Sequence, residues 1–362
     1  MCNEAPVVSF CRSSLWRHLR RLPLLALPLL LLACAPKLQP LGPPITEPAF
    51  GGNQLMMNDG VALPLRHWPA EGKTKAVVLA LHGFNDYSKA FEEPAEDWAK
   101  AGIETYAYDQ RGFGETPYRG LWPGNQRLID DAKSAAKILQ ARRPNRPFYV
   151  LGESMGGAVV MAAAVGPDPI KANGLILVAP AIWGRDSIGW MGSDTLWLFA
   201  HSIPWYTVDG RGLRIEPSDN WDMLRKLARD PLVIKETRVD AVYGLVGLMD
   251  LAWAAAPHMP GDSLFLYGGK EQVIDDEAAA DMLRRLPQGP LGPRVALYPQ
   301  GYHMLLRDLN AEVVRGDVIA WIMEPADRLP SKADLRAERL LVNPDAKLTT
   351  AASLPVPAPP TR

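Results

Sequence analysis

The segment Gly152-Glu153-Ser154-Met155-Gly156 constrains the fold of this chain more than any other feature. It follows the apolar run 147–151 and opens the small-residue stretch 158–164, which predicts a strand, a very short turn and a helix. The turn is so sharp that a Cβ two residues before or after the serine would collide with a neighbouring strand or helix, so glycine is needed there. Such a turn exposes the Ser154 hydroxyl at the carboxyl end of a sheet, as a candidate nucleophile.

Strand and helix patterns alternate on both sides of this turn. The pattern predicts strands at 76–81, 103–108, 147–151, 174–179, 263–267 and 294–298, with helices at 91–101, 126–141, 154–165, 276–286 and 308–323. Residues 54–68 predict an antiparallel pair that turns at Asn58-Asp59-Gly60. We therefore expect an α/β fold, a doubly wound and mostly parallel sheet, with a helical cap inserted where the alternation stops.

The domain boundaries follow from these patterns and from composition. We expect a sheet core made of residues 54–183 and 262–330, and a helical cap at 184–261. Residues 34–53 are rich in proline and are expected to form a semi-extended tether. Residues 331–362 form a C-terminal extension, whose Pro-, Ala- and Thr-rich end from 343 onward is expected to be disordered.

The first 33 residues have the features of an export signal. Four arginines precede the apolar run 22–32, which is too short to span a bilayer, and Ala33-Cys34 follows. The sequence Leu31-Leu32-Ala33-Cys34 resembles a bacterial lipobox, so we expect a lipoprotein signal peptide and a lipidated Cys34. Removing residues 1–33 leaves Cys34 with no other cysteine as a disulfide partner. The alternative is an ordinary signal peptide cut near Ala33 or Ala35.

Composition narrows the function classes. The chain of 362 residues is 48% hydrophobic, enough for one large core or for one core with an inserted lid. Its formal net charge of −1 gives no indication of a nucleic-acid partner. No nucleotide-binding glycine loop is visible, and we expect no metal.

A serine nucleophile needs a base, and in this type of fold the base follows the serine and the acid along the chain. The chain has six histidines: His18, His67, His82, His201, His258 and His303. The first lies in the signal, the next two precede Ser154, and His201 and His258 lie in the insertion. Only His303 directly follows a late strand, so we predict it as the base.

The acid is expected after strand 263–267. Glu271 comes at the end of that strand, whereas Asp275 resembles the cap of the next helix. We therefore predict Glu271, with Asp275 as the alternative. Asp109 and Arg111 precede the serine, and we expect them to stabilise a turn.

The oxyanion hole of such a site needs two backbone donors. The Met155 N–H lies at the start of the helix after Ser154. The second donor is expected in the loop after strand 76–81, where the Phe84 N–H fits.

Five motifs in order resemble the monoacylglycerol lipase/lysophospholipase branch of the α/β-hydrolases, which is similar to serine aminopeptidases of the S33 type. They are His82-Gly-Phe-Asn-Asp86, Asp109-Gln-Arg-Gly-Phe-Gly114, Gly152-Glu-Ser-Met-Gly156, Tyr267-Gly-Gly-Lys-Glu271 and Gly301-Tyr-His303. The resemblance covers residues 54 to 324. It implies a helical cap, no cofactor, and hydrolysis of acyl esters. That branch normally has aspartate where this chain has Glu271.

We expect a membrane-anchored serine esterase that acts on small-molecule esters of the monoacylglycerol or lysophospholipid type. The alternatives are an acyltransferase with the same triad, or a binding protein of the cell envelope on a hydrolase scaffold.

The insertion contains a regular series of tryptophans, at intervals of seven, seven and eight residues: Trp183, Trp190, Trp197 and Trp205. We expect this apolar stretch, with Trp197 at its middle, either to line an acyl site or to pack the cap onto the core. In a host with two membranes, Ala35 after the lipidated cysteine favours the outer membrane.

Overall fold

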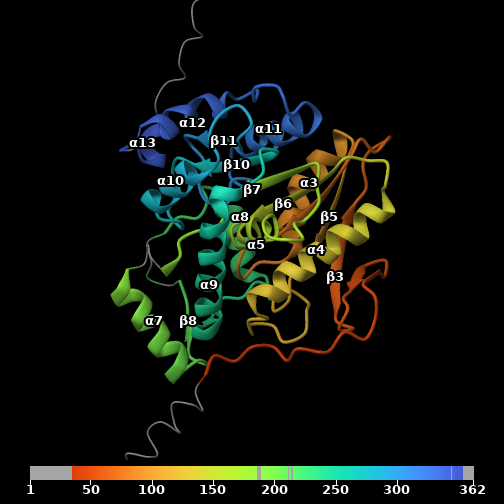
Figure 1. Cartoon of the computed structure of the whole chain (residues 1–362), viewed down its shortest axis with the longest axis vertical. Coiled ribbons are helices and arrows are strands. Elements are labelled where there is room, and N and C mark those ends of the chain that lie inside the picture. The colour runs from red at the N-terminus through yellow and green to blue at the C-terminus, as the bar shows by residue number, and fades with distance from the viewer. Residues whose placement is uncertain (1–34, 186–188, 211, 213–214, 344, 354–362) are drawn as a thin grey trace, which may run out of the picture.

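The computed structural model describes residues 35–185, 189–210, 212, 215–343 and 345–353 (Figure 1). The expected signal peptide and Cys34 lie outside the described residues.

Within the described part of the chain, nine strands form one sheet, in the order β1-β2-β3-β5-β4-β6-β7-β10-β11. The pairs that join β1, β2, β3 and β5 are antiparallel, and those from β5 to β11 are parallel. The expected doubly wound, mostly parallel sheet is confirmed. The strands are β1 (Ala49–Phe50), β2 (Gln54–Met56), β3 (Ala62–Trp68), β4 (Ala76–Leu81), β5 (Ile103–Tyr108), β6 (Phe148–Glu153), β7 (Gly174–Val178), β10 (Ser263–Gly268) and β11 (Arg294–Tyr298).

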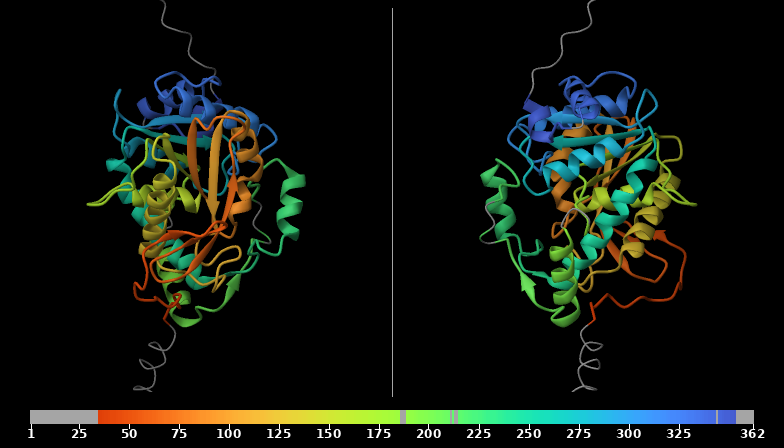
Figure 2. Two further views of the ribbon diagram at one scale, coloured as in Figure 1. Left: turned by 90° about the vertical axis from the view of Figure 1, so that its right-hand side faces the viewer. Right: turned by 60° about the vertical axis from the view of Figure 1, so that its left-hand side comes forward.

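Helices cover both faces of this sheet (Figures 1 and 2). In β4, Val77, Leu79 and Leu81 face the core shared with α4, α5, α9 and α10, while the alternate residues face the core shared with α3 and α11. The two-residue period of a strand explains why such a central strand is apolar at every position. These helices are α3 (Glu92–Lys100), α4 (Asn125–Arg142), α5 (Met155–Ala163), α9 (Val239–Ala255), α10 (Asp276–Arg285) and α11 (Ala311–Met323).

The insertion runs round the lower end and one side of the sheet domain (Figure 2, green). It contains α7 (Trp190–Ser202), β8 (Thr207–Val208), α8 (Trp221–Arg229), β9 (Thr237–Arg238) and α9. The expected cap of residues 184–261 needs correction at its end, because α9 packs along α5 and buries Leu248, Ala252 and Ala255 in the core. Residues 239–258 are apolar enough to cross a bilayer, but half of that stretch is buried, as in a core helix.

The expected tether of residues 34–53 does not extend freely from the domain. The Gln39 backbone N–H donates to the Trp122 carbonyl, and the Gln39 side chain donates to the Leu121 carbonyl. Farther along, β1 pairs with β2, and the Arg142 guanidinium lies 3.6 Å from the centre of the Phe50 ring. This segment follows the domain surface because its backbone finds partners there, which its proline content does not reveal.

The C-terminal extension also differs from expectation. Helix α12 (Ala333–Val342) packs on β11, and α13 (Leu348–Ser353) buries Leu348, Ala351 and Ala352 completely. The expected disorder from residue 343 onward is therefore wrong for α13, because its small apolar side chains fit against the core. A Cβ at Gly269 would lie 2.7 Å from the Ala352 Cβ, so α13 supports the loop that leads to Glu271.

Candidate active site

Ser154 lies between β6 and α5 in a strained conformation, with φ 52° and ψ −116°. A non-glycine residue is rarely held at positive φ unless its surroundings enforce it. Here the conformation is enforced by tight packing at the two glycines that flank the serine. A Cβ on Gly152 would overlap the Gly156 carbonyl, and one on Gly156 would overlap the Leu81 carbonyl of β4. The sequence pattern is thus explained by the packing of β4, β6 and α5 around one turn.

His82, at the end of β4, fixes the loop that faces Ser154. The Gln110 backbone N–H donates to His82 Nε2 at 2.9 Å, so the ring proton lies on Nδ1, 2.8 Å from the Gly83 carbonyl. Burial lowers the pKa of His82, which keeps the ring neutral in this role. The loop then approaches the nucleophile closely, since a Cβ at Gly83 would lie 3.3 Å from the Ser154 Cβ.

The two expected oxyanion donors belong to adjacent segments of this arrangement. Met155 is the first residue of α5, where a backbone N–H has no partner within the helix. Phe84 directly follows Gly83, and its ring packs against Phe113 and Trp122. Asn85, at φ 64°, accepts a hydrogen bond from Ile234 N–H at 2.9 Å through its backbone carbonyl. The insertion therefore helps to hold the Phe84 backbone in place.

The structure brings Glu271 and His303 together. Glu271 Oε2 lies 2.8 Å from His303 Nδ1, and both side chains are buried. The other carboxylate oxygen, Oε1, accepts the N–H groups of Val273 at 2.6 Å and Ile274 at 3.0 Å. Asp275 instead caps α10 by accepting the Ala278 N–H at 2.9 Å. The two acids that the sequence left open thus have different partners.

The electrostatics of this pair suit a base and its orienting acid. Burial alone would lower the pKa of His303, but the charge and hydrogen bond of Glu271 outweigh it and hold that pKa above its ordinary value. For Glu271 the effect of burial has the opposite sign. Burial alone would raise the pKa of Glu271, but His303 and the two backbone donors outweigh it and hold that pKa below its ordinary value. Glu271 therefore stays ionised and stabilises a proton on His303.

Residues 217–220 of the insertion contact the loop 299–310, which follows β11, carries His303 and is called the histidine loop below. No sequence pattern indicated this contact. The Met304 N–H donates to the Pro217 carbonyl at 2.9 Å. Ser218 Oγ donates to Asp308 at 2.7 Å, and the other oxygen of Asp308 accepts the Tyr302 N–H at 2.7 Å. Burial raises the pKa of Asp308 to about 6. Contacts between residues so far apart leave no local pattern to find.

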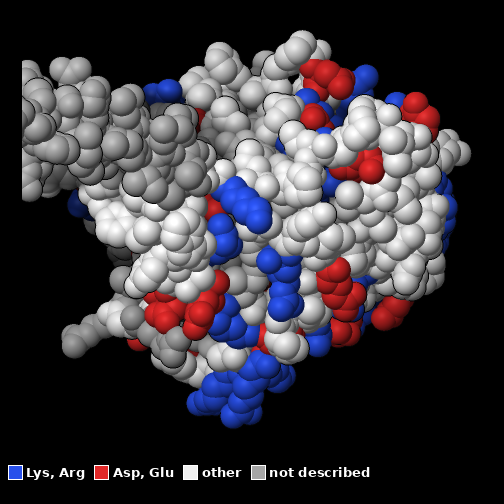
Figure 3. All heavy atoms as spheres, turned by 90° about the horizontal axis from the view of Figure 1, so that it is seen from below, with Lys and Arg blue, Asp and Glu red and all other residues white. Residues whose placement is uncertain are grey.

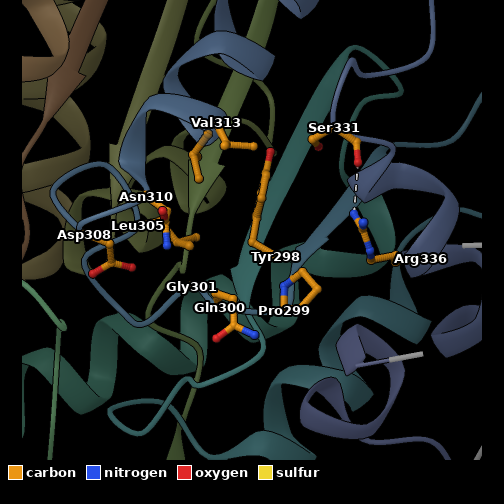
Figure 4. A pocket seen from close by; sticks show the side chains of 11 residues that line it. Tyr298, Pro299, Gln300, Gly301, Leu305, Asp308, Asn310, Val313, Ser331 and Arg336 are labelled. Atoms are coloured by element: carbon orange, nitrogen blue, oxygen red, sulfur yellow. Dashed lines mark hydrogen bonds between the residues drawn. The ribbon is translucent and has the colours of Figure 1, made fainter. Parts of the chain in front are cut away.

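A cavity of about 430 Å³ is lined in part by the histidine loop (Figure 4). Among the lining side chains, Tyr298 lies between Leu305 and Val313 on one side and Arg336 and Ser331 on the other. Ser154, Glu271 and His303 do not line this cavity. Among the described residues, no group of three or more His, Cys, Asp or Glu side chains has an arrangement that could hold a metal ion.

Trp197 is 52% exposed on α7 and stacks on His201, with the ring centres 4.4 Å apart. Leu198 and Phe199 beside it are also exposed. The sequence left open whether this stretch lines an acyl site or packs the cap onto the core, and about half of the Trp197 surface is exposed, so Trp197 is not a buried packing residue. Seen from below, the molecule shows basic and acidic side chains interspersed among broad uncharged areas (Figure 3).

Asp109 and Arg111 occupy structural positions, as expected. Asp109 accepts hydrogen bonds from the Ser88 N–H, the Ser88 hydroxyl and the Glu115 N–H. The Arg111 guanidinium is buried and pairs with Asp59 at 2.8 Å and Asp131 at 2.5 Å. Both residues fix the loop after β5.

Comparisons with known proteins agree with this architecture. A curated monoacylglycerol lipase of Mycolicibacterium smegmatis is 23% identical over 269 residues, which are 73% of this chain and 94% of the relative. A monoglyceride lipase of Rattus norvegicus is 24% identical over 262 residues, 70% of this chain and 84% of that protein.

The solved structures that match share the fold. The monoacylglycerol lipase of Paleococcus ferrophilus superposes with a TM-score of 0.59 at 19% identity, over 72% of this chain and 98% of that one. A carboxyl esterase of Bacillus coagulans in complex with glycerol gives a TM-score of 0.61 at 21% identity, over 74% of this chain and 95% of that one. These likenesses establish the α/β-hydrolase fold.

The family model described as serine aminopeptidase, S33, matches residues 72–310, which contain β4, the turn at Ser154, the insertion, and the loops of Glu271 and His303. The chain belongs to this family of α/β-hydrolases, and it is an enzyme of the carboxylic ester hydrolase class.

Proposed function

We propose that this enzyme hydrolyses monoacylglycerol-like or lysophospholipid-like esters through an acyl-enzyme on Ser154. The observation that carries the mechanism is the buried Glu271–His303 pair at 2.8 Å, on the loops that follow β10 and β11. These loops lie at the carboxyl edge of the sheet, as does the strained Ser154 after β6. An ionised acid, a histidine and a serine held in this way are the components of acyl transfer.

Because Nδ1 of His303 faces Glu271, Nε2 is the nitrogen left to take the proton from the Ser154 hydroxyl. The hydroxyl oxygen then bonds to the ester carbonyl carbon, and the carbonyl oxygen becomes an oxyanion. The Phe84 and Met155 N–H groups are its proposed donors. When the tetrahedral intermediate collapses, His303 gives the proton to the departing alcohol. Water then attacks the acyl group with His303 as base, and the carboxylic acid leaves as Ser154 recovers its proton.

The acyl and alcohol preferences are supported by the relatives. Those from Mycolicibacterium smegmatis and Rattus norvegicus are named as lipases of monoacylglycerol and monoglyceride. The exposed apolar side chains Trp197, Leu198 and Phe199 offer a surface for an acyl chain at the cap. We include Trp197 in the proposed substrate-binding surface.

A panel of p-nitrophenyl esters of increasing chain length tests this function. Wild-type protein is expected to cleave them and to react with a fluorophosphonate probe, and Ser154→Ala is expected to do neither. Wild-type protein that is neither active nor labelled would instead indicate a binding protein on a hydrolase scaffold. Product analysis with competing alcohols distinguishes hydrolysis from acyl transfer to a second alcohol, since the same triad serves both.

We further propose that the enzyme is exported and anchored by lipid on Cys34, in the outer membrane where the host has two membranes. The lipobox-like Leu31-Leu32-Ala33-Cys34 supports this proposal. Three acyl chains would hold the protein firmly, since each buried CH₂ contributes about 0.8 kcal/mol. Cells labelled with palmitate are expected to yield labelled wild-type protein in the membrane fraction and unlabelled, soluble Cys34→Ser. Unlabelled, soluble wild-type protein would contradict the anchor.

A further inference from the structure

Four segments carry the proposed catalytic groups; Arg307 contacts two of them and itself belongs to a third. It lies four residues after His303, and its side chain is 7% exposed. One guanidinium nitrogen, Nη1, lies 2.8 Å from Asp86 Oδ2 in the loop after β4. The other, Nη2, donates to Glu153 Oε2 at 3.1 Å, directly before Ser154. One cation therefore connects the loop after β4 that carries Phe84, the turn at Ser154, and the histidine loop.

This cluster is buried and only partly satisfied. Asp86 and Glu153 are buried with Arg307, and Glu153 Oε1 and Arg307 Nε have no hydrogen-bond partner among the residues that the structure describes. Removing three charges from water is costly, and well-packed apolar residues often replace such a cluster without loss of stability. The cluster is therefore better explained by the need to fix these three segments relative to one another than by a contribution to the stability of the fold.

The insertion also contributes to this arrangement. The Arg307 carbonyl accepts a hydrogen bond from Asn220 Nδ2 at 2.9 Å. The Arg307 N–H donates to the Met304 carbonyl at 2.8 Å, within the histidine loop. Both the backbone and the side chain of Arg307 are thus held, and its guanidinium has a defined place.

We propose that Arg307 is a positioning residue, which sets the placement of the oxyanion donors, Ser154 and His303 relative to one another through Asp86 and Glu153. The proposal rests on the acyl-enzyme mechanism proposed above. A displacement of about 1 Å in such a site costs on the order of 100-fold in rate, so loss of this cation is expected to reduce kcat far more than it changes KM.

The experiment compares Arg307→Met and Arg307→Lys with Arg111→Met as a matched control. Arg111 is also buried and also pairs with two carboxylates, those of Asp59 and Asp131, but neither of them lies on a loop with a proposed catalytic group. Per folded protein, we expect Arg307→Met to lose about 100-fold in kcat and in the rate of fluorophosphonate labelling, with KM little changed. Arg307→Lys is expected to recover at least part of both rates, and Arg111→Met to keep both.

A neutral triple variant, Asp86→Asn, Glu153→Gln and Arg307→Met, separates positioning from stability and covers the case in which Arg307→Met does not fold. Asp86 accepts the Tyr87 N–H at 2.9 Å, and the amide oxygen of the asparagine that replaces it can accept the same N–H. We expect this variant to unfold near the wild-type temperature while kcat and labelling stay low.

Recovery of kcat together with stability in the triple variant would overturn the proposal, as would an Arg307→Met protein whose kcat and labelling equal those of Arg111→Met. Failure of the acyl-enzyme mechanism itself has a different result, because wild-type protein would then not be labelled, or Ser154→Ala would remain active.

Discussion

The carboxyl edge of the sheet and helix α7 of the insertion hold their side chains in different ways. At the sheet edge, Glu271 and His303 are buried, and each has a defined hydrogen-bond partner. On α7, Trp197, Leu198 and Phe199 are about half exposed. The sheet edge is therefore suited to chemistry, which requires fixed distances, and α7 to an apolar ligand, which does not. Substitutions at the two places should differ in kind as well as in size.

The largest effect is expected at the sheet edge. Ser154→Ala and His303→Ala should each lower kcat by about 10⁴- to 10⁶-fold, because each removes a component of one proton-transfer unit. The double variant should lose little more than either single variant. Steady-state kinetics on a short ester measures all three, and additive losses would contradict a shared role.

Glu271→Gln should come next, with a loss in kcat on the order of 10⁴-fold, since a carboxamide neither fixes the histidine tautomer nor stabilises the imidazolium. Asp275→Asn is the matched control, because asparagine also caps helices well. It should keep kcat near the wild-type value. The opposite ranking of the two variants would assign the acid to Asp275.

The pH dependence sharpens the role of the same pair. The proposed base, His303, can accept a proton only when it is unprotonated, and Glu271 holds the pKa of His303 above the ordinary value of histidine. The acidic limb of kcat/KM should therefore lie above pH 6.5, about the ordinary pKa of histidine. In Glu271→Gln the effect of burial remains without the opposing charge, so the limb of the residual activity should move to lower pH. A limb that does not move would separate Glu271 from His303.

Stability distinguishes two of the helices of the insertion, α7 and α9. Leu248 of α9 is fully buried against the core, so Leu248→Ala should cost about 2–5 kcal/mol in the free energy of unfolding. Leu198 of α7 is 52% exposed, and Leu198→Ala should change stability by no more than about 0.5 kcal/mol. Denaturant titrations give both values, and equal losses would mean that α7 packs as tightly as α9.

The smallest effect is expected for Trp197→Ala. Its melting temperature should stay near that of the wild type, because the ring is half exposed. KM for long-chain esters should rise by about 10-fold, while acetate and butyrate esters are spared, if the ring contacts the distal acyl chain. Equal KM values across the ester panel would leave Trp197 outside the substrate-binding surface.

The sequence was sufficient where the signal is local or ordered along the chain. Strand β4 is apolar at every position, and the glycines around Ser154 have a steric cause that five residues express. The order of serine, acid and base selected His303 among six histidines. The choice of Glu271 over Asp275 used the helix cap, and the structure places Asp275 at that cap.

The sequence was insufficient where contacts join distant segments. Arg307 and Glu153 are 154 residues apart, and neither has a periodic pattern that points to the other. The docking of residues 37–50 and of α13 depends on backbone partners and small side chains, whereas their composition indicated a tether and disorder. Likewise α9 has the composition of a cap helix, and only its contacts with α5 assign it to the core.

The most direct test of the account is the mass of the acyl-enzyme. Protein mixed rapidly with a long-chain p-nitrophenyl ester, quenched in acid and digested, is expected to carry the acyl group on the peptide that contains Ser154. His303→Ala should carry far less acyl group at the same time point. An acyl group on a different residue, or turnover by wild-type protein with no acyl peptide at any time, would contradict nucleophilic catalysis by Ser154.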